Sequence, residues 1–146
     1  MTARTGKDSN PDIVIAGAGY VGLACAVAIK SSAPDLDVIV ADAAPPGAFE
    51  RDSRASAIAV AASRMLDTLG VWDEILPHAQ AINEMIVTDS RTSDPVRPTF
   101  LTFGGQAEPG EPFAHMVPNV AMTRALRRSG FIASSRLARR SEDAAR

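Results

Sequence analysis

The sequence has 146 residues, a formal net charge of −2 and 46% hydrophobic residues, which is the size and balance of one globular domain. The near-neutral charge and the scarcity of aromatic residues, with one Trp and one Tyr, argue against nucleic acid as a partner. The single cysteine cannot form an internal disulfide, and the first ten residues lack the apolar stretch of a signal peptide. No apolar run approaches the roughly 20 residues of a membrane-spanning helix. We therefore expect a cytoplasmic protein, for which peripheral membrane contact stays open.

The first part of the chain has the pattern of a βαβ unit. Residues 1–11 are polar and are expected to form a flexible leader. Residues 12–16 and 37–42 are short β-branched runs typical of buried parallel strands, and residues 20–32 between them have helical spacing. Pro34 ends that helix. Two parallel strands joined by such a helix predict a right-handed crossover in an α/β fold.

The predicted helix has an apolar stripe, which we expect to face the core. The stripe has the spacing i, i+3, i+4, i+7 and i+8 and consists of Val21, Ala24, Cys25, Ala28 and Ile29. On this interpretation Cys25 is a small core residue.

The rest of the chain predicts a long loop, helices and a small antiparallel excursion from residue 84 to 118. The expected elements are a loop from residue 43 to 55, a helix at 63–69 capped by Gly70, further helical turns at 71–79, strands at 84–91, 99–104 and 113–119, and a helix from about Val120. Residues 127–146 carry many arginines and serines, and we expect them to be disordered. Binding of this tail to anionic lipid is a weaker alternative.

A glycine-rich turn follows the first predicted strand. It reads "GAGYVG" and comprises Gly17, Ala18, Gly19, Tyr20, Val21 and Gly22. In a dinucleotide-binding fold three such glycines allow a tight turn, a close approach of the pyrophosphate, and packing of the helix on the strand. The positive end of the helix would then face the phosphates.

Asp42 strengthens this interpretation, because it ends the second predicted strand twenty residues after Gly22. A carboxylate at that place accepts hydrogen bonds from the ribose hydroxyls of an adenosine and disfavours the extra phosphate of NADP. The alternative is that the glycines only pack a helix on a sheet and Asp42 only caps a loop. The turn by itself does not separate NAD from FAD.

Two further stretches carry a resemblance to a known family. They are "ERDSRASAIAVAASRMLDTLGVWDEI", residues 50–75, and "EPFAHMVPNVAMTRAL", residues 111–126. With the glycine turn, they resemble the FAD-dependent aromatic monooxygenases related to p-hydroxybenzoate hydroxylase, in the branch of the ubiquinone-biosynthesis hydroxylases. The resemblance covers residues 12–126, which we expect to be the amino-terminal part of an FAD-binding domain.

The resemblance implies a function and a set of cofactor contacts. In the family NAD(P)H reduces FAD, and the reduced flavin uses oxygen to hydroxylate an aromatic ring, here a ubiquinone precursor with or without a prenyl tail. Arg54 matches a family arginine near the flavin and its phosphates, and Asn119 matches a polar cofactor contact. Asp42 stands where family members more often carry Glu. No side chain is named as catalytic. Association with the inner membrane or with a biosynthetic complex stays open.

Simpler roles compete with these assignments. Taken alone, Arg54 is a solvated arginine, and Asn119 beside a proline serves a turn equally well. His78 and His115 lack acidic or cysteine partners at metal-ligand spacing, so we expect structural roles and no metal site. Trp72 and the stripe from Met65 to Leu69 are expected to be core.

Family members also continue well beyond this sequence, with a second FAD motif containing a Gly-Asp pair. Two alternatives therefore stay open beside the hydroxylase. The chain is a catalytically inactive portion that binds only the ADP part of a dinucleotide, or it is an NAD-binding module that acts with a second polypeptide.

Overall fold

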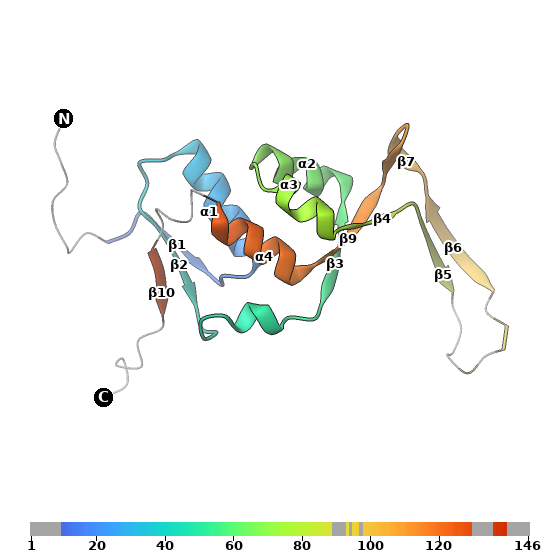
Figure 1. Cartoon of the computed structure of the whole chain (residues 1–146), viewed down its shortest axis with the longest axis horizontal. Helices are drawn as coiled ribbons and strands as arrows, with labels where there is room; N and C mark the ends of the chain where they lie inside the picture. The colour runs from blue at the N-terminus through green and yellow to red at the C-terminus, as the bar shows by residue number, and fades with distance from the viewer. Residues whose placement is uncertain (1–9, 89–92, 94, 97, 130–135, 140–146) are drawn as a thin grey trace. The chain divides into compact units, whose positions relative to one another are not determined.

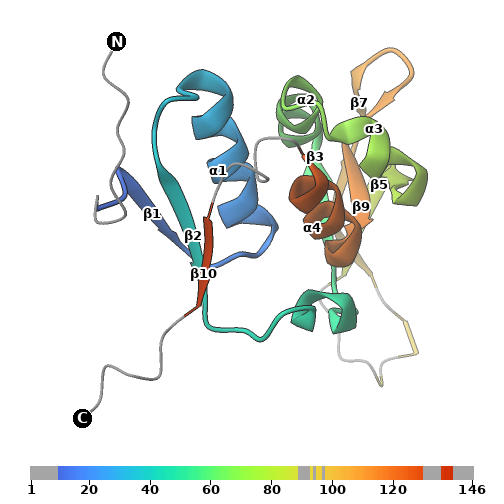
Figure 2. The ribbon, with the colours of Figure 1, turned by 60° about the vertical axis from the view of Figure 1, so that its left-hand side comes forward.

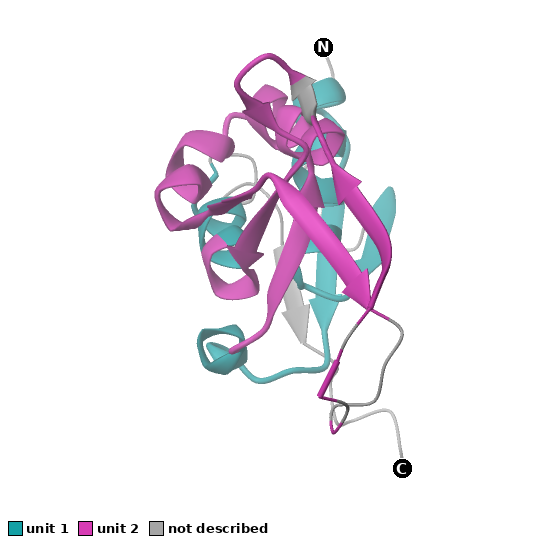
Figure 3. Cartoon of the chain, turned by 90° about the vertical axis from the view of Figure 1, so that its right-hand side faces the viewer, with its two compact units in different colours: residues 1–52, 122–146 teal, residues 53–121 magenta. Residues whose placement is uncertain are grey.

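The computed structural model describes residues 10–88, 93, 95–96, 98–129 and 136–139 (Figure 1). Most of the predicted leader lies outside these residues. So do parts of the turn between the strands predicted at 84–91 and 99–104. The chain divides into two compact units, which Figure 3 shows in different colours. Unit 1 comprises Met1–Asp52 and Met122–Arg146, and unit 2 comprises Ser53–Ala121. Helix α4 (Asn119–Arg128) begins in unit 2 and continues into unit 1.

Unit 1 contains the predicted βαβ arrangement. Its elements are β1 (Ile13–Ala16), α1 (Tyr20–Ser32), β2 (Val38–Asp42), a 3-10 helix η1 (Ala48–Arg51), most of α4, and β10 (Arg136–Arg139). The strands form a parallel sheet in the order β1-β2-β10. Ile13 lies beside Val38, and the register continues to Ala16 beside Ala41. Helix α1 lies along β1 and β2, as Figure 2 shows. The α/β fold with a Rossmann-like βαβ start is therefore confirmed.

The predicted core face of α1 is wrong. The side chains buried on this helix are those of Leu23, Ala26, Val27 and Lys30, whereas Val21 is 63% exposed and Cys25 is also exposed. The helix is apolar on more than one face, so periodicity alone could not select the buried one. The buried face is the one that follows from the close approach of Gly22 to Gly17, which sets the side of the helix that meets the strand.

The end of the chain also differs from expectation. Helix α4 extends to Arg128, beyond the point where the sequence predicted loss of regular structure. Residues Arg136–Arg139 form β10, which pairs in parallel with β2 and places Arg139 beside Asp42 in the register. The prediction of a disordered tail is therefore wrong for this strand. Residues 130–135 and 140–146 lie outside the described part of the chain.

Unit 2 is built around small antiparallel sheets. Its elements are β3 (Ala55–Ala59), α2 (Val60–Thr68), α3 (Trp72–Ile75), a 3-10 helix η2 (Leu76–His78), β4 (Gln80–Ile82), β5 (Glu84–Thr88), β6 (Thr99–Gly104), β7 (Gln106–Glu108), β8 (Glu111–Pro112) and β9 (Ala114–Pro118). They form a sheet with the order β3-β9-β4 and two separate hairpins, β5-β6 and β7-β8. Ile58, Leu66, Val71, Ile75 and Val117 are buried in this unit.

Two strand assignments in unit 2 need correction. Residues 55–59 were expected to be loop or unassigned chain, but they form β3 and pair with β9. The third predicted strand, β9, does not extend the β5-β6 hairpin and instead pairs with β3 and β4. Strand β3 consists mainly of small residues, and its partner lies about 60 positions away, so local pattern gives little signal for either pairing.

The end of α2 follows its predicted chemistry. Gly70 has a φ of 71°, a left-handed conformation that favours glycine. Its N–H donates to the Asp67 carbonyl at 2.8 Å, and the Val71 N–H donates to the Leu66 carbonyl at 3.1 Å. These two bonds form a Schellman cap, which satisfies carbonyls that a helix end otherwise leaves free. The helix itself begins at Val60, three positions before its predicted start at Ser63.

Candidate nucleotide-binding site

Two glycines of the turn between β1 and α1 are required by the backbone itself. Gly17 has a φ of 100°, where a side chain would be strained. Its N–H donates to the Ala41 carbonyl at 2.7 Å and so joins the turn to β2. At Gly22 an added Cβ would lie 2.0 Å from the Gly17 carbonyl oxygen. The glycine at that position therefore permits α1 to pack against the turn.

Gly19 is different, because nothing in the structure requires a glycine there. It precedes α1 with a φ of −72°, which any residue can adopt, and an added Cβ would meet no atom within 4 Å. No side chain caps the helix start, and its first turn contains no acidic residue. The 13-residue helix thus presents the positive end of its dipole to open space above Gly19. This geometry suits the close approach of an anion to the backbone.

Asp42 lies at the carboxyl end of β2 and is tied to the glycine turn. Its Oδ2 accepts a hydrogen bond from the Ala18 N–H at 2.8 Å, and its Oδ1 accepts one from the Ala44 N–H at 2.9 Å. The Ala44 N–H lowers the pKa of Asp42 most, and the Ala18 N–H and the positive charge of Arg127 also lower it. The carboxylate is therefore ionised at neutral pH, and each oxygen keeps capacity to accept a further bond. Asp42 caps a loop, as the simpler alternative required, and it also contacts the turn.

Arg54 and Asn119 come together in unit 2. The Asn119 N–H donates to the Arg54 carbonyl at 2.9 Å, and the Asn119 side-chain oxygen accepts a bond from the Ser56 hydroxyl at 2.7 Å. Asn119 is buried, whereas the Arg54 side chain is exposed. Asn119 thus holds the start of α4 to β3. Sequence reasoning missed Ser56, because its partner lies 63 positions away.

A second group missed by sequence reasoning lies in unit 1, where η1 meets α4. The guanidinium carbon of Arg127 lies 4.7 Å from the centre of the Phe49 ring, and Arg124 forms an ion pair with Glu50. The sequence analysis placed Arg127 in a disordered tail. Continuation of the helical pattern through residues 124–128 was the available signal.

The two histidines have different surroundings. The His115 ring lies 5.3 Å from the Trp72 ring at an angle of 71°, an edge-to-face contact. His78 is exposed at the end of η2. Within the described ranges, no cluster of three or more His, Cys, Asp or Glu side chains is arranged to hold a metal ion. In the same ranges, no helix combines the length and the apolar character needed to cross a bilayer.

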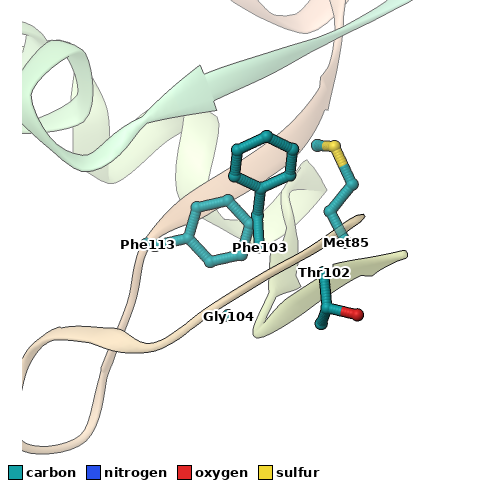
Figure 4. A pocket seen from close by; sticks show the side chains of 5 residues that line it. All are labelled: Met85, Thr102, Phe103, Gly104 and Phe113. Carbon is teal, nitrogen blue, oxygen red and sulfur yellow. The ribbon is translucent and has the colours of Figure 1, made fainter. Parts of the chain in front are cut away.

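Unit 2 contains a pocket of about 590 Å³ beside the β5-β6 hairpin. Met85, Thr102, Phe103, Gly104 and Phe113 line it. Figure 4 shows Met85 and Phe103 extending to one side of the hairpin and Thr102 to the other. The lining is mainly apolar and includes two aromatic rings, which suits a planar apolar ligand better than a charged one.

Comparison with known proteins gives one sequence relative and a consistent group of folds. No protein-family model matches the chain. Ubiquinone hydroxylase UbiL of Rhodospirillum rubrum is 38% identical over 124 residues, which cover 82% of this chain and 27% of that protein. The chain therefore spans about a quarter of the length of this relative.

The similar solved structures are longer as well. The flavin-dependent monooxygenase PieE, in complex with FAD and substrate, matches 92% of this chain and 24% of its own, with a TM-score of 0.63 and 15% identity. The p-nitrophenol 4-monooxygenase PnpA from Pseudomonas putida DLL-E4 matches 87% of this chain and 31% of its own, with a TM-score of 0.62 and 14% identity. These two structures support the fold.

The sequence relative and the shared fold agree with the resemblance carried by the glycine turn and the two downstream stretches. The partial coverage fits an amino-terminal portion of a longer enzyme. The chain is therefore similar in sequence to a ubiquinone hydroxylase over about a quarter of that protein's length, and it shares the fold of the flavin-dependent monooxygenases.

Proposed function

We propose that this chain forms the ADP-binding part of an FAD-dependent monooxygenase that hydroxylates the aromatic ring of a ubiquinone precursor with NAD(P)H and oxygen. The observation that carries the proposal is the hydrogen bond between the Asp42 carboxylate and the Ala18 N–H. This bond joins the carboxylate that would bind the ribose to the turn that would bind the phosphates. A ligand that contains both a ribose and a phosphate would use the two features together.

The residues of unit 1 fit the ADP half of FAD. The backbone of residues 17–22 would hold the pyrophosphate at the open space beside Gly19, where a Cβ would meet no protein atom. Asp42 would accept hydrogen bonds from the ribose hydroxyls, because its carboxylate is ionised and partly exposed. By the resemblance, Arg54 would lie near the flavin and Asn119 would make a polar contact with the cofactor.

When bound, FAD supplies the redox chemistry with oxygen, and the chain's own residues bind and orient it. None of these residues needs to act as an acid, a base or a nucleophile. The open apolar pocket beside β5 and β6 would offer aromatic and aliphatic contacts to an aromatic substrate. NAD(P)H as reductant, and a cytoplasmic location with or without peripheral attachment to the inner membrane, belong to the same proposal and rest on the resemblance.

A second candidate function is nucleotide binding without turnover. The contacts in unit 1 favour it, because the space at Gly19 and the Asp42 carboxylate would engage only the ADP half of a dinucleotide. In this case the chain binds ADP and FAD with similar affinity, since only the shared half makes contacts.

Titration of the purified chain with FAD, ADP and NAD, followed by calorimetry and by the flavin spectrum, tests the proposal. FAD binding tighter than ADP binding, with NAD(P)H oxidation stimulated by an aromatic substrate, supports the hydroxylase. Equal binding of FAD and ADP without oxidation supports the second candidate. Binding of NAD without affinity for FAD would contradict both, and the Gly19→Val variant serves as the non-binding control.

A further inference from the structure

The β7-β8 hairpin of unit 2 places two glutamates at directly opposite positions. Glu108 on β7 is the register partner of Glu111 on β8, and the turn between them contains Gly110, whose φ is 86°. Like charges at opposite positions of an antiparallel pair repel and destabilise it. A two-stranded hairpin is marginal even without such repulsion. We therefore expect the closed hairpin to depend on a positive charge beside the two glutamates.

Arg64 on helix α2 supplies that charge. Its Nη2 donates to Glu108 Oε1 at 2.8 Å and to Glu111 Oε2 at 2.6 Å, and its Nε donates to Glu111 Oε1 at 3.3 Å. The contact with Glu111 is bidentate, the geometry in which an arginine holds a carboxylate most firmly. One guanidinium thus joins both strands of the hairpin and attaches them to α2.

The three side chains are not deeply buried, and this sets the size of the effect. Their exposed fractions are 53% for Arg64, 68% for Glu108 and 30% for Glu111. A single exposed ion pair adds little stability, because water screens it and two flexible side chains must be ordered. Here one cation contacts two carboxylates, so its removal leaves a repulsion as well as ending an attraction. We expect a moderate effect that is specific to the hairpin.

The two ends of the hairpin lead into the apolar pocket of unit 2. Gly104 ends β6 shortly before β7, Phe113 directly follows β8, and both line the pocket of about 590 Å³ (Figure 4). Helix α2 also holds Phe113 by its backbone, because the Val60 N–H donates to the Phe113 carbonyl at 3.0 Å. Val60 and Arg64, one turn apart on α2, therefore contact the chain on either side of Pro112.

We propose that Arg64 is a positioning residue for the ligand pocket, which keeps the β7-β8 hairpin closed on α2 and so fixes where Phe113 lies in the pocket wall. The inference rests on the proposed function, because that function assigns an aromatic ligand to this pocket. Arg64 itself is not among the lining residues and would make no contact with the ligand. The ligand class is a neutral planar aromatic compound, because the lining is mainly apolar and includes two aromatic rings.

Titration of the full chain with 2-naphthol, followed by the amide chemical shifts of Phe103, Gly104 and Phe113, tests this role. Arg64→Gln should weaken 2-naphthol binding at least threefold, because the two glutamates then repel each other and the hairpin opens. Asp67→Asn, which removes a charge from an exposed position on the same helix, is the matched control and should change the affinity less than twofold. Equal affinity of these two variants would overturn the inference.

A second substitution separates closure of the hairpin from general damage to α2. Glu108→Gln in the Arg64→Gln background removes the repulsion, so it should return the affinity for 2-naphthol to within twofold of wild type. Damage to the helix would not be repaired by a change on β7. A double variant that binds as weakly as Arg64→Gln would therefore overturn the inference.

Two single variants cover the case in which Arg64→Gln does not fold. Glu111→Gln breaks the bidentate contact beside Phe113, whereas Glu108→Gln leaves that contact intact. Both variants relieve the repulsion, so they differ in the attachment to α2. We expect Glu111→Gln to weaken 2-naphthol binding at least twofold and Glu108→Gln to leave it unchanged, and equal affinities would contradict the proposal. Melting followed by circular dichroism confirms that each variant is folded.

The wild-type titration separates this inference from the proposed function. If 2-naphthol at millimolar concentration shifts none of the pocket amides, the aromatic pocket of the proposed function fails, and the role of Arg64 fails with it. If the wild type binds 2-naphthol and Arg64→Gln binds it equally well, only the role of Arg64 is overturned.

Discussion

The glycine turn of unit 1 and the β5-β6 hairpin of unit 2 use their surfaces in opposite ways. At the turn, hydrogen bonds of Gly17 and Asp42 join backbone groups, and an added Cβ at Gly19 would meet no atom within 4 Å. On the hairpin, large apolar side chains lie exposed, among them Ile86 at 57% and Phe100 at 73%. The contacts of the turn are all made by residues 17–44. The hairpin has the character of an interaction surface.

The register of the hairpin sharpens this difference. Met85 lies opposite Phe103 and Val87 opposite Leu101, so these side chains share one face, while Ile86 faces the other side. The hairpin therefore carries apolar side chains on both faces, although Ile86 lies opposite the polar Thr102. A two-stranded hairpin is marginal by itself, and its apolar faces are expected to gain stability from further contacts. The turn is thus closed by its own backbone contacts, whereas the hairpin leaves apolar surface uncovered.

Gly22→Ala should have the largest effect on stability, because the added methyl group would clash with the backbone of the turn. The new Cβ would lie 2.0 Å from the Gly17 carbonyl oxygen, so either α1 or the turn must move. We expect a loss of about 3 kcal/mol or more in the free energy of unfolding, at the upper end for overpacking. Urea denaturation followed by circular dichroism measures it. Gly19→Ala is the matched control, and equal stability of the two variants would refute the packing argument.

Gly19→Val should leave the fold intact and remove nucleotide binding. A side chain at this position meets no protein atom within 4 Å but would fill the space in which a pyrophosphate approaches the backbone. We expect a melting temperature close to that of the wild type and at least a fiftyfold loss of ADP affinity by calorimetry. Unchanged affinity would mean that the turn is structural only.

Asp42→Asn should weaken ADP binding by about tenfold, because a neutral amide forms weaker hydrogen bonds with ribose hydroxyls than a carboxylate does. Asp35→Asn, an exposed substitution in the same unit, is the matched control and should change the affinity less than twofold. Calorimetry at pH 7 measures both. If the two variants bind ADP equally, Asp42 is only a loop cap.

The stability of the Asp42→Asn variant should also differ in its dependence on pH. The pKa of Asp42 in the folded chain lies below its ordinary value of 3.8. The ionised carboxylate therefore stabilises the fold above about pH 4, and this stabilisation is lost as the pH falls through the folded-state pKa. Wild type should exceed the variant in stability at pH 6, and the difference should shrink toward pH 3. A constant difference between those pH values would contradict this account.

Phe100→Ser should have the smallest effect on the nucleotide site. The side chain is 73% exposed, and exposed substitutions of this kind usually change stability by less than about 0.5 kcal/mol. We expect ADP affinity within twofold of wild type and less binding of a fluorescent apolar dye. A large loss of ADP affinity would show that the hairpin contributes to nucleotide binding and would contradict this prediction.

The parts of the fold that the sequence predicted well are those set by local chemistry. The glycine turn, the end of α2 at Gly70 and the strands β5 and β6 each follow from neighbouring residues. The strand β3 and its pairing with β9 were missed, because a sheet formed by distant segments leaves little trace in either one. The buried face of α1 was wrong for a related reason, since the contact of Gly22 with Gly17 selected it.

The candidate site also divides into residues whose roles follow from neighbouring sequence and residues whose roles depend on distant partners. Gly17, Gly22 and Asp42 were found because their roles follow from spacing along one βαβ unit. Ser56 was missed, because its partner lies 63 positions away in sequence. Arg127 was missed, because the helical pattern continues past Leu126, where the sequence analysis ended it. Asn119 was found through the resemblance alone, and its buried hydrogen bonds give it a structural role that spacing could not reveal.

Titration of the isotopically labelled chain with ADP, followed by amide chemical shifts, tests the central claim most directly. We expect the largest shifts on the amides of Ala18, Gly19, Tyr20 and Asp42, and unchanged amides in the β5-β6 hairpin. Shifts confined to the hairpin, or no shifts at millimolar ADP, would contradict the claim that the glycine turn and Asp42 form a nucleotide-binding site.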